Sequence, residues 1–265
     1  MKQNTAKFTP AAVALSVETA VLAERIPQGI PVRSALWAGA AGAAALCILA
    51  ALCMAAAQNP ASRRVLKAVL TAGFAAEFVR TLGQAQRVCM QEFSSMALLG
   101  FLPLLLWAGW SIRPASWNAP AHILWWFAAL GGAVCLLGLG GQMHWYRLPE
   151  FSGMRSTGMV WMVPLYAEYF ALPFLCEAPA QRRLLWLPTA SFLVQAAVLT
   201  AGALLFGTEV YPQMELLRAW STGSFSRMDA FLLLLWLLCA VYRMAVLCAS
   251  IRLLWQPQTG QEALE

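Results

Sequence analysis

Two long stretches of this chain contain no charged residue, and they restrict what it can fold into. Residues 34–62 and 184–208 are uncharged, and each is longer than the ~20 residues that a helix needs to cross the hydrocarbon core of a bilayer. Of the whole chain, 60% of residues are hydrophobic and 11% are charged, whereas a soluble domain carries about 25% charged residues. Such a surplus cannot be buried inside a globule, so lipid must cover much of the surface. We therefore predict an all-α integral membrane protein.

Apolar runs separated by charged or turn-forming segments predict a polytopic bundle of about eight transmembrane helices. In chain order we expect helices near residues 9–26, 34–57, 68–90, 94–112, 122–141, 157–176, 184–207 and 228–254. Pro164 and Pro173 are expected to interrupt the sixth helix, because proline removes a helix hydrogen bond and clashes with the preceding turn. Residues 1–255 then form a single transmembrane domain, and residues 256–265 form a short polar tail.

The distribution of Lys and Arg favours a cytoplasmic N-terminus, because short cytoplasmic loops are enriched in basic residues. With that orientation, the basic clusters at residues 63–67 and 182–183 lie on the same, cytoplasmic side. The net charge of +6 lies mostly in loops, so it indicates topology and anionic lipid rather than binding to nucleic acid.

The sequence contains no pattern that is typical of an enzyme or of a metal site. Its seven cysteines form no CxxC motif, and its two histidines lie far from acidic or thiol clusters. Ser/His/Asp and Cys/His arrangements and phosphate-binding glycine loops are not recognisable either. We therefore expect no enzymatic activity and no cofactor or metal.

Residues 211–236 carry a polar pattern that leads directly into the eighth predicted helix. The positions that form this pattern are Tyr211, Pro212, Glu215, Leu216, Arg218, Ser221, Gly223, Phe225, Arg227, Asp229, Ala230 and Trp236. The pattern resembles the spore-germination permease family, which comprises the B subunits of GerA-type germinant receptors. Two further segments are similar to that family: PLYAEYFALPFL at residues 164–175, and LSVETAVLAERIP at residues 15–27.

The resemblance implies a fold of the amino acid–polyamine–organocation transporter superfamily. That LeuT-like fold has ten helices in two inverted repeats, with the first and sixth helices broken in the middle. Because this chain ends after its eighth predicted helix, we expect a partial inverted repeat. A small germinant, usually an amino acid, is then expected to bind between the two breaks. The positions implied as ligand-binding are Glu18, Thr19, Ala20, Pro164, Tyr166 and Glu168.

The resemblance also implies partners and a location. The chain is expected to form a hetero-oligomer with germinant receptor A and C subunits in the cell membrane or the spore inner membrane. A docking surface for those subunits is expected at Glu215, Arg218, Arg227 and Asp229. The alternative for these four residues is a solvated loop and helix cap.

Several charged side chains are predicted to lie inside membrane helices, where an unpaired charge is costly. We therefore expect Glu168 to contact the amine of a ligand or to carry a proton that is coupled to transport. The alternative is a structural acid that is hydrogen-bonded to backbone groups freed by the proline break. Glu18 is its counterpart in the first helix, and the alternatives there are snorkelling or pairing with a basic neighbour. Glu77 and Arg80 are three residues apart and are predicted to form an internal ion pair. Arg243 either snorkels to an interface or faces the bundle.

Three functions remain open from the sequence. The first is a transporter-like subunit of a spore germinant receptor that senses a small nutrient such as an amino acid. The second is an amino-acid permease that works as a secondary transporter. The third is a reduced, non-binding membrane scaffold, which the Thr19–Ala20–Val21 run favours, because the family tends to have glycine beside a small residue there.

Overall fold

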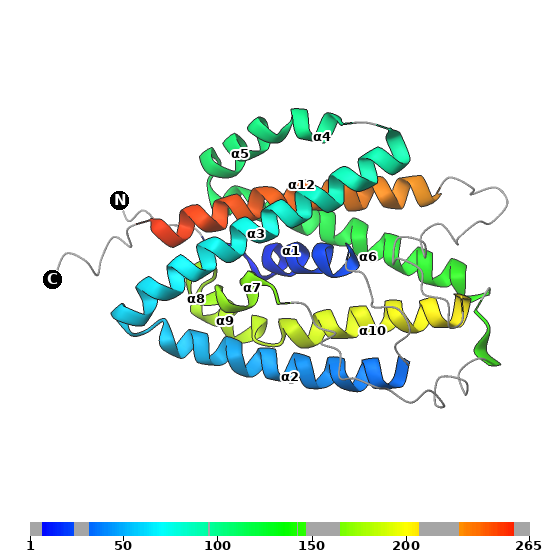
Figure 1. The fold of residues 1–265 in the computed structure, drawn as a ribbon, viewed down its shortest axis with the longest axis horizontal. Helices are drawn as coiled ribbons and strands as arrows, with labels where there is room; N and C mark the ends of the chain where they lie inside the picture. Colours follow the sequence, from blue (N-terminus) through cyan, green and yellow to red (C-terminus); the bar gives the residue numbers. More distant parts are fainter. Residues whose placement is uncertain are drawn as a thin grey trace.

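The computed structural model describes residues 7–23, 32–94, 96–141, 143–146, 165–206 and 228–256, and regular secondary structure in these ranges is helical (Figure 1). The all-α prediction is therefore confirmed for the part of the chain that is described. In chain order the elements are α1 (Pro10–Ala23), α2 (Val32–Ala56), α3 (Pro60–Phe93), α4 (Ala97–Gly100), α5 (Leu102–Ser111), the 3-10 turn η1 (Pro114–Trp117), α6 (Asn118–Gly140), α7 (Ala167–Phe170), α8 (Leu172–Leu175), α9 (Ala178–Leu184), α10 (Leu187–Phe206) and α12 (Met228–Trp255).

Four stretches of helix are long and apolar enough to cross a membrane: 35–56, 114–140, 178–205 and 230–255. They correspond to the second, fifth, seventh and eighth predicted spans. The described helices α1 and α5 are also apolar, but they are shorter. The structure thus supports an integral membrane protein, while the total of about eight spans and the inverted repeat stay predictions.

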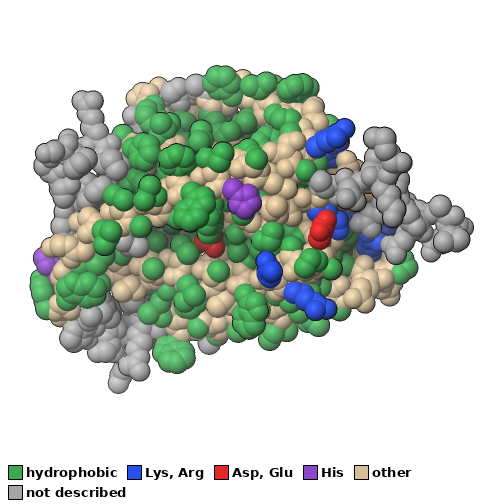
Figure 2. Space-filling view, turned by 180° about the vertical axis from the view of Figure 1, so that it is seen from behind, with side chains coloured by type: hydrophobic (Ala, Val, Ile, Leu, Met, Phe, Trp, Pro, Cys, Tyr) green, Lys and Arg blue, Asp and Glu red, His purple; other side chains and the backbone are tan. Residues whose placement is uncertain are grey.

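Large hydrophobic side chains cover much of the outer surface, as Figure 2 shows for one face of the molecule. Leu137, Trp126 and Trp186 are 81%, 75% and 71% exposed. Exposed apolar area on this scale is unfavourable in water and is expected where lipid tails are the solvent. The surface therefore agrees with the membrane location that the composition predicts.

The last helix, α12, lies in the middle of the bundle and not at its periphery. It contacts α3, α5, α1 and α6, and α10 packs against α2 on the far side of α1 (Figure 1). In its most apolar stretch 72% of the residues are buried, against 28%, 24% and 33% in the other three candidate spans. Any polar side chain in the middle of α12 therefore meets protein and not lipid.

The third helix begins earlier than predicted. It starts at Pro60, because the Asn59 side chain accepts a hydrogen bond from the Ala61 N–H at 3.0 Å, and because proline suits the first turn of a helix. The basic residues Arg63 and Lys67 consequently belong to this helix. The expectation that they lie in a connecting loop is wrong.

Basic side chains gather toward one end of the molecule, which lies at the right in Figure 2. Lys7 donates to the Pro173 and Cys176 carbonyls at 3.4 and 3.3 Å, and the Arg63 guanidinium lies 5.7 Å from the centre of the Phe174 ring, so both cations lie against α8. Arg252, in the last turn of α12, donates to the Trp110 carbonyl within α5 and to the Ile112 carbonyl just after it. This gathering at one end agrees with the prediction that the basic clusters share a side of the membrane.

Two predicted helices are divided by short interruptions. The fourth divides at Phe101 into α4 and α5, with a proline in the first turn of α5. The sixth is represented in the described residues by α7 and α8, which are separated at Ala171, and Pro173 lies in the first turn of α8. The predicted interruption near Pro173 is confirmed, whereas Pro164 lies outside the described residues.

The first helix is not interrupted where the family resemblance implies a break. Helix α1 is continuous through Thr19 and Ala20, and the Thr19 hydroxyl donates to the Leu15 carbonyl one turn earlier at 2.7 Å. The expectation of a break at residues 19–21 is therefore wrong. The physical reason is local: neither glycine nor proline occurs in this helix after Pro10, so its hydrogen bonds continue.

A glycine allows α5 to approach the central helix closely, and this contact can be tested. A Cβ at Gly109 would lie 2.6 Å from the Cys248 Cβ and 3.0 Å from the Ala245 carbonyl oxygen, both on α12. We expect Gly109→Ala to lower the free energy of unfolding by about 1–3 kcal/mol, as overpacking of a core does. Thermal unfolding of the detergent-purified protein measures the effect.

The matched control is Gly132→Ala on α6, where an added Cβ meets no atom within 4 Å. This substitution should leave stability unchanged or raise it by up to about 1 kcal/mol through helix propensity. Equal midpoints for the two variants would contradict a tight α5–α12 contact.

Candidate functional site

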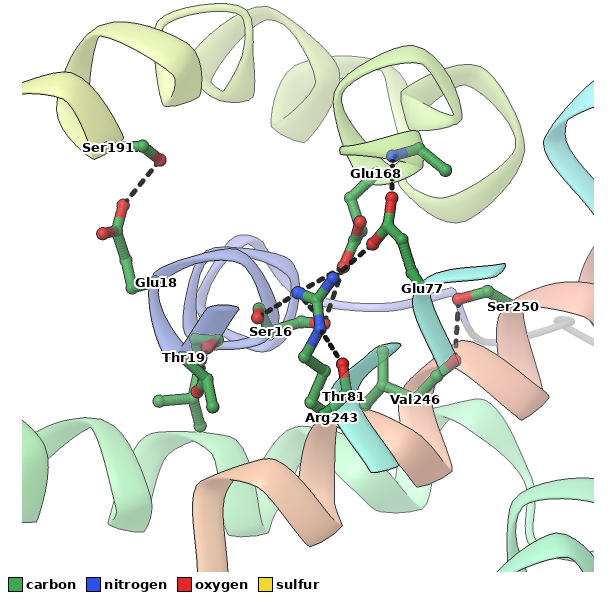
Figure 3. Close-up of polar contacts among 12 residues, drawn as sticks. Ser16, Glu18, Thr19, Glu77, Thr81, Glu168, Ser191, Arg243, Val246 and Ser250 are labelled. Carbon is green, nitrogen blue, oxygen red and sulfur yellow. Dashed lines mark hydrogen bonds and ion pairs between the residues drawn. The ribbon is translucent and has the colours of Figure 1, made fainter. Parts of the chain in front are cut away.

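A single buried arginine on α12 organises the polar core of the described structure. Arg243 is 1% exposed and forms ion pairs with Glu77 of α3 and with Glu168 of α7, the latter at 2.8 Å (Figure 3). It also donates to the Ser16 carbonyl of α1 and to the Thr81 hydroxyl of α3, at 3.2 Å for Thr81. The guanidinium therefore joins four elements that are distant in the sequence. We call these five residues the charged centre.

The local geometry of each helix explains why these side chains meet. Glu77 and Thr81 are four residues apart, so they lie on the same face of α3. Glu168 lies in the single turn α7 and is 1% exposed. The Tyr166 ring covers the guanidinium of Arg243, with 5.2 Å between the guanidinium carbon and the ring centre. Such stacking suits arginine, because its planar, weakly hydrated cation tolerates burial better than an ammonium does.

The two carboxylates of the charged centre are also held by neutral donors. One Glu77 oxygen accepts the backbone N–H of Ala167 at the start of α7. Gly73 lies one turn earlier on α3, and a Cβ there would lie 3.1 Å from the Ala167 Cβ. The Ser16 hydroxyl donates to Glu168 Oε1 at 2.9 Å. The second oxygen of Glu168, Oε2, is buried and has no hydrogen-bond partner among the described residues.

A second polar group lies on the other side of α1, as Figure 3 shows. Glu18 is 7% exposed, and its Oε1 accepts a hydrogen bond from the Ser191 hydroxyl of α10 at 2.8 Å. Its Oε2 is buried without a hydrogen-bond partner among the described residues. The Trp236 indole N–H of α12 donates to the Thr19 carbonyl at 3.1 Å and holds this part of α1 in place.

The structure buries five of the six residues that the sequence implied as a ligand site, but it places Glu18 and Glu168 on different sides of α1 (Figure 3). Glu18, Thr19, Ala20, Tyr166 and Glu168 are all buried, on α1 and at the start of α7. The Thr19 hydroxyl donates its hydrogen bond to the Leu15 carbonyl of the same helix. Pro164, the remaining implied residue, lies outside the described ranges.

Glu77 has Arg243 as its ion-pair partner in the structure, and Arg80 is exposed, so the Glu77–Arg80 pair stays a prediction. Glu215, Arg218 and Arg227 of the expected docking surface lie outside the described residues. Asp229 belongs to the first turn of α12, but its side chain is not among those described.

The sequence left the central role of Arg243 undecided, and the structure shows that Arg243 faces the bundle. The available signal was an arginine in the middle of the apolar segment 228–254, since such a charge needs a buried partner or a route to an interface. Ser16 and Ser191 were missed altogether, because an isolated serine in an apolar helix is compatible with lipid, with packing and with hydrogen bonding.

The described residues contain no group of three or more His, Cys, Asp or Glu side chains that could hold a metal ion. All seven cysteines are free. The polar core thus consists of carboxylates, hydroxyls and one guanidinium, and this chemistry suits hydrogen bonding to a small polar or cationic species.

Comparisons with protein-family models, with curated proteins and with solved structures found no match to this chain. The similarity to germination permeases therefore stays a prediction from the sequence pattern. The described structure defines the chain's class as an all-helical integral membrane protein with a buried charged centre.

The charged centre predicts a large effect of removing its cation. Arg243→Met leaves Glu77 and Glu168 buried without their counter-charge, so we expect a loss of about 3–5 kcal/mol of stability. Adding Glu77→Gln and Glu168→Gln to that variant should restore part of the loss, because no buried carboxylate then lacks a cation in this centre. Thermal unfolding in detergent measures both changes.

Arg64→Met on the exposed surface of α3 is the control, and it should change stability by less than about 0.5 kcal/mol. An Arg243→Met protein as stable as the Arg64→Met protein would show that the ion pairs do not hold the helices together.

Proposed function

We propose that this chain is a transporter-like membrane subunit that binds a small nutrient, such as an amino acid, and passes a conformational signal to partner subunits. The observation that carries the proposal is the position of Glu168. This carboxylate is buried next to the interruption between α7 and α8, and one of its oxygens has no partner among the described residues. Interrupted helices with a polar group at the break are a common way for membrane proteins to hold small charged solutes.

The contacts of Glu168 suggest how binding would be transmitted. An amino group that approaches Oε2 would compete with Arg243 and Ser16 for the charge of this carboxylate. Weakening of the 2.8 Å ion pair would loosen the contact between α7 and α12. Arg243 would then pair mainly with Glu77 on α3. A ligand can shift a conformational equilibrium only through such differential contacts.

The pattern at residues 211–236 supports the same proposal from the sequence. It resembles the B subunits of GerA-type germinant receptors, and A and C subunits would then be the partners that receive the signal. In this proposal the protein lies in the cell membrane or spore inner membrane with its N-terminus in the cytoplasm. Lys7 and Arg63 both lie against α8, and this basic cluster supports that orientation.

A second candidate is a non-binding membrane scaffold, and two observations favour it. Helix α1 is continuous through Thr19 and Ala20, where the family resemblance implies an unwound ligand site. Glu168 is also already paired with Arg243, so its negative charge is partly neutralised within the protein. An amino-acid permease would use the same polar core, but would move its ligand across the membrane.

Ligand-dependent thermal stabilisation tests the proposal. We expect one or a few amino acids from a panel to stabilise the detergent-purified protein in a concentration-dependent way, by about 2.7 kcal/mol at 100 times Kd, and so to raise its unfolding temperature. Glu168→Gln should reduce that response at least tenfold in apparent affinity, because it removes the carboxylate charge. Glu177→Gln, at an exposed carboxylate on the N-terminal side of α9, is the matched control and should respond as the wild type does.

The remaining outcomes separate the alternatives. A panel without any saturable response would favour the scaffold. An equal response in Glu168→Gln would remove this residue from the binding site. Accumulation of a labelled responding amino acid in proteoliposomes would identify a permease and contradict a receptor that only senses.

A further inference from the structure

Helix α3 exposes one side along more than half of its length. The side that faces the bundle includes Phe74, Glu77 and Thr81, which are buried against the neighbouring helices. In Figure 1 the helix crosses in front of α12, its main contact. The opposite side consists of residues that recur every three or four positions and are all exposed, and we call it the outer face of α3: Val69, Ala72, Ala76, Arg80, Gly83 and Arg87.

Arg80 lies on this outer face near the middle of the membrane. Its neighbour Thr81 accepts a hydrogen bond from the Arg243 guanidinium at 3.2 Å, and Arg243 is at the middle of the candidate span 230–255. The hydrocarbon core is ~30 Å thick, so each of its edges is about 15 Å from the middle. An arginine side chain is shorter than that distance, so snorkelling alone does not bring the charge of Arg80 to the headgroups.

This depth makes lipid a poor covering for the outer face. Arg80 interacts within the chain and is nevertheless exposed. Charged residues at such depth almost always face protein or a water-filled cavity, because a charge in hydrocarbon is costly. Among the described helices, the four stretches that are apolar enough to span a membrane do not include α3. The outer face is therefore better suited to contact with protein than to contact with lipid tails.

Small residues surround Arg80 on this face. Ala72 and Ala76 lie two turns and one turn before it, and Gly83 lies about one turn after it. A Cβ at Gly83 would meet no atom within 4 Å. Small residues allow the backbone of a second membrane helix to approach closely. Small residues alone would fit any helix, whereas the exposed cation in their midst selects a helix with negative charge.

A second copy of this chain does not supply that charge from its described side chains. The carboxylates that the structure places near this depth, Glu18, Glu77 and Glu168, are all buried inside their own bundle. We propose that the outer face of α3 binds a membrane-spanning helix of a different protein, and that this helix carries a glutamate or aspartate near its middle, opposite Arg80. Opposite charges attract more strongly at this depth than in water, because the surroundings are less polarisable.

The bound helix would lie directly behind the charged centre. Glu77 and Thr81 contact Arg243 from the inner side of the same part of α3, so a shift of α3 would move both of its sides together. The proposal does not depend on a nutrient, because it follows from the exposure and depth of Arg80. A failure of nutrient binding would leave it standing.

A designed membrane helix tests the charge complementarity. The probe is a Leu/Ala peptide of ~23 residues with one central Glu, and the matched peptide has Gln at that position. Energy transfer between labelled protein and labelled peptide in phosphatidylcholine vesicles measures association. We expect the wild type to bind the Glu peptide at least about tenfold more tightly than the Gln peptide. Arg80→Leu should remove this preference, and Arg80→Lys, which keeps the charge, should retain it.

Three further variants make the peptide test specific. Arg64→Leu removes an exposed cation near the start of α3 and should leave the preference unchanged. Arg87→Leu removes a cation about 10 Å further along the helix and should reduce the preference less than Arg80→Leu does. Glu168→Gln should lose the amino-acid response and keep the peptide preference. Equal binding of the two peptides to the wild type, or an undiminished preference in Arg80→Leu, would overturn the proposal.

Photo-cross-linking in the cells that make this protein identifies the natural occupant. A photoreactive residue replaces Val79, which is 67% exposed beside Arg80, and the control position is Leu137 of α6, which is 81% exposed. We expect a discrete protein adduct at position 79 that Arg80→Leu abolishes, and mass spectrometry should find an acidic residue within the membrane helix of the adduct. Adducts with phospholipid alone, or with copies of the same chain alone, would show that no such partner covers this face.

Discussion

The pairing of Arg243 with Glu77 and Glu168 is the constraint on which the rest of the described structure depends. A guanidinium in the middle of an apolar helix is tolerated only with anionic partners close by. Those partners come from α3 and α7, and Ser16 of α1 completes the set of contacts. The central position of α12 follows from this requirement, because only a helix surrounded by other helices can satisfy such a side chain.

Close packing makes this arrangement possible. Helices in a membrane gain little from hydrophobic association, because lipid tails are as apolar as the side chains that they replace. Association then relies on dispersion contacts and on interhelical polar bonds. Gly109 lets α5 approach α12, and Gly73 lets α3 approach the start of α7, where the Ala167 N–H reaches Glu77. Small residues and buried charges therefore act together at the same interfaces.

Helix α1 separates two polar places with different chemistry. On one face Ser16 contacts Arg243 and Glu168, where one guanidinium is shared by two carboxylates. On another face Glu18 accepts a hydrogen bond from the Ser191 hydroxyl of α10. A displacement of α1 would change both places together, since the two residues are joined by one short stretch of rigid helix.

The sequence by itself determined the helical class, the membrane as solvent, and the positions of the apolar helices at 34–57, 184–207 and 228–254. These properties depend on composition and on local signals such as proline residues and the length of segments without charged residues. It also indicated that Glu18 and Glu168 need a polar or charged partner or a proton, because a carboxylate in an apolar helix is energetically unfavourable whatever its neighbours are. Only the tertiary structure decided that α12 is central, that Arg243 pairs with Glu77 and Glu168, and that Ser191 reaches Glu18. An apolar helix is equally compatible with lipid and with protein, and a charge can be satisfied by any opposite charge that packing brings within reach, so these choices depend on contacts between residues far apart in the chain.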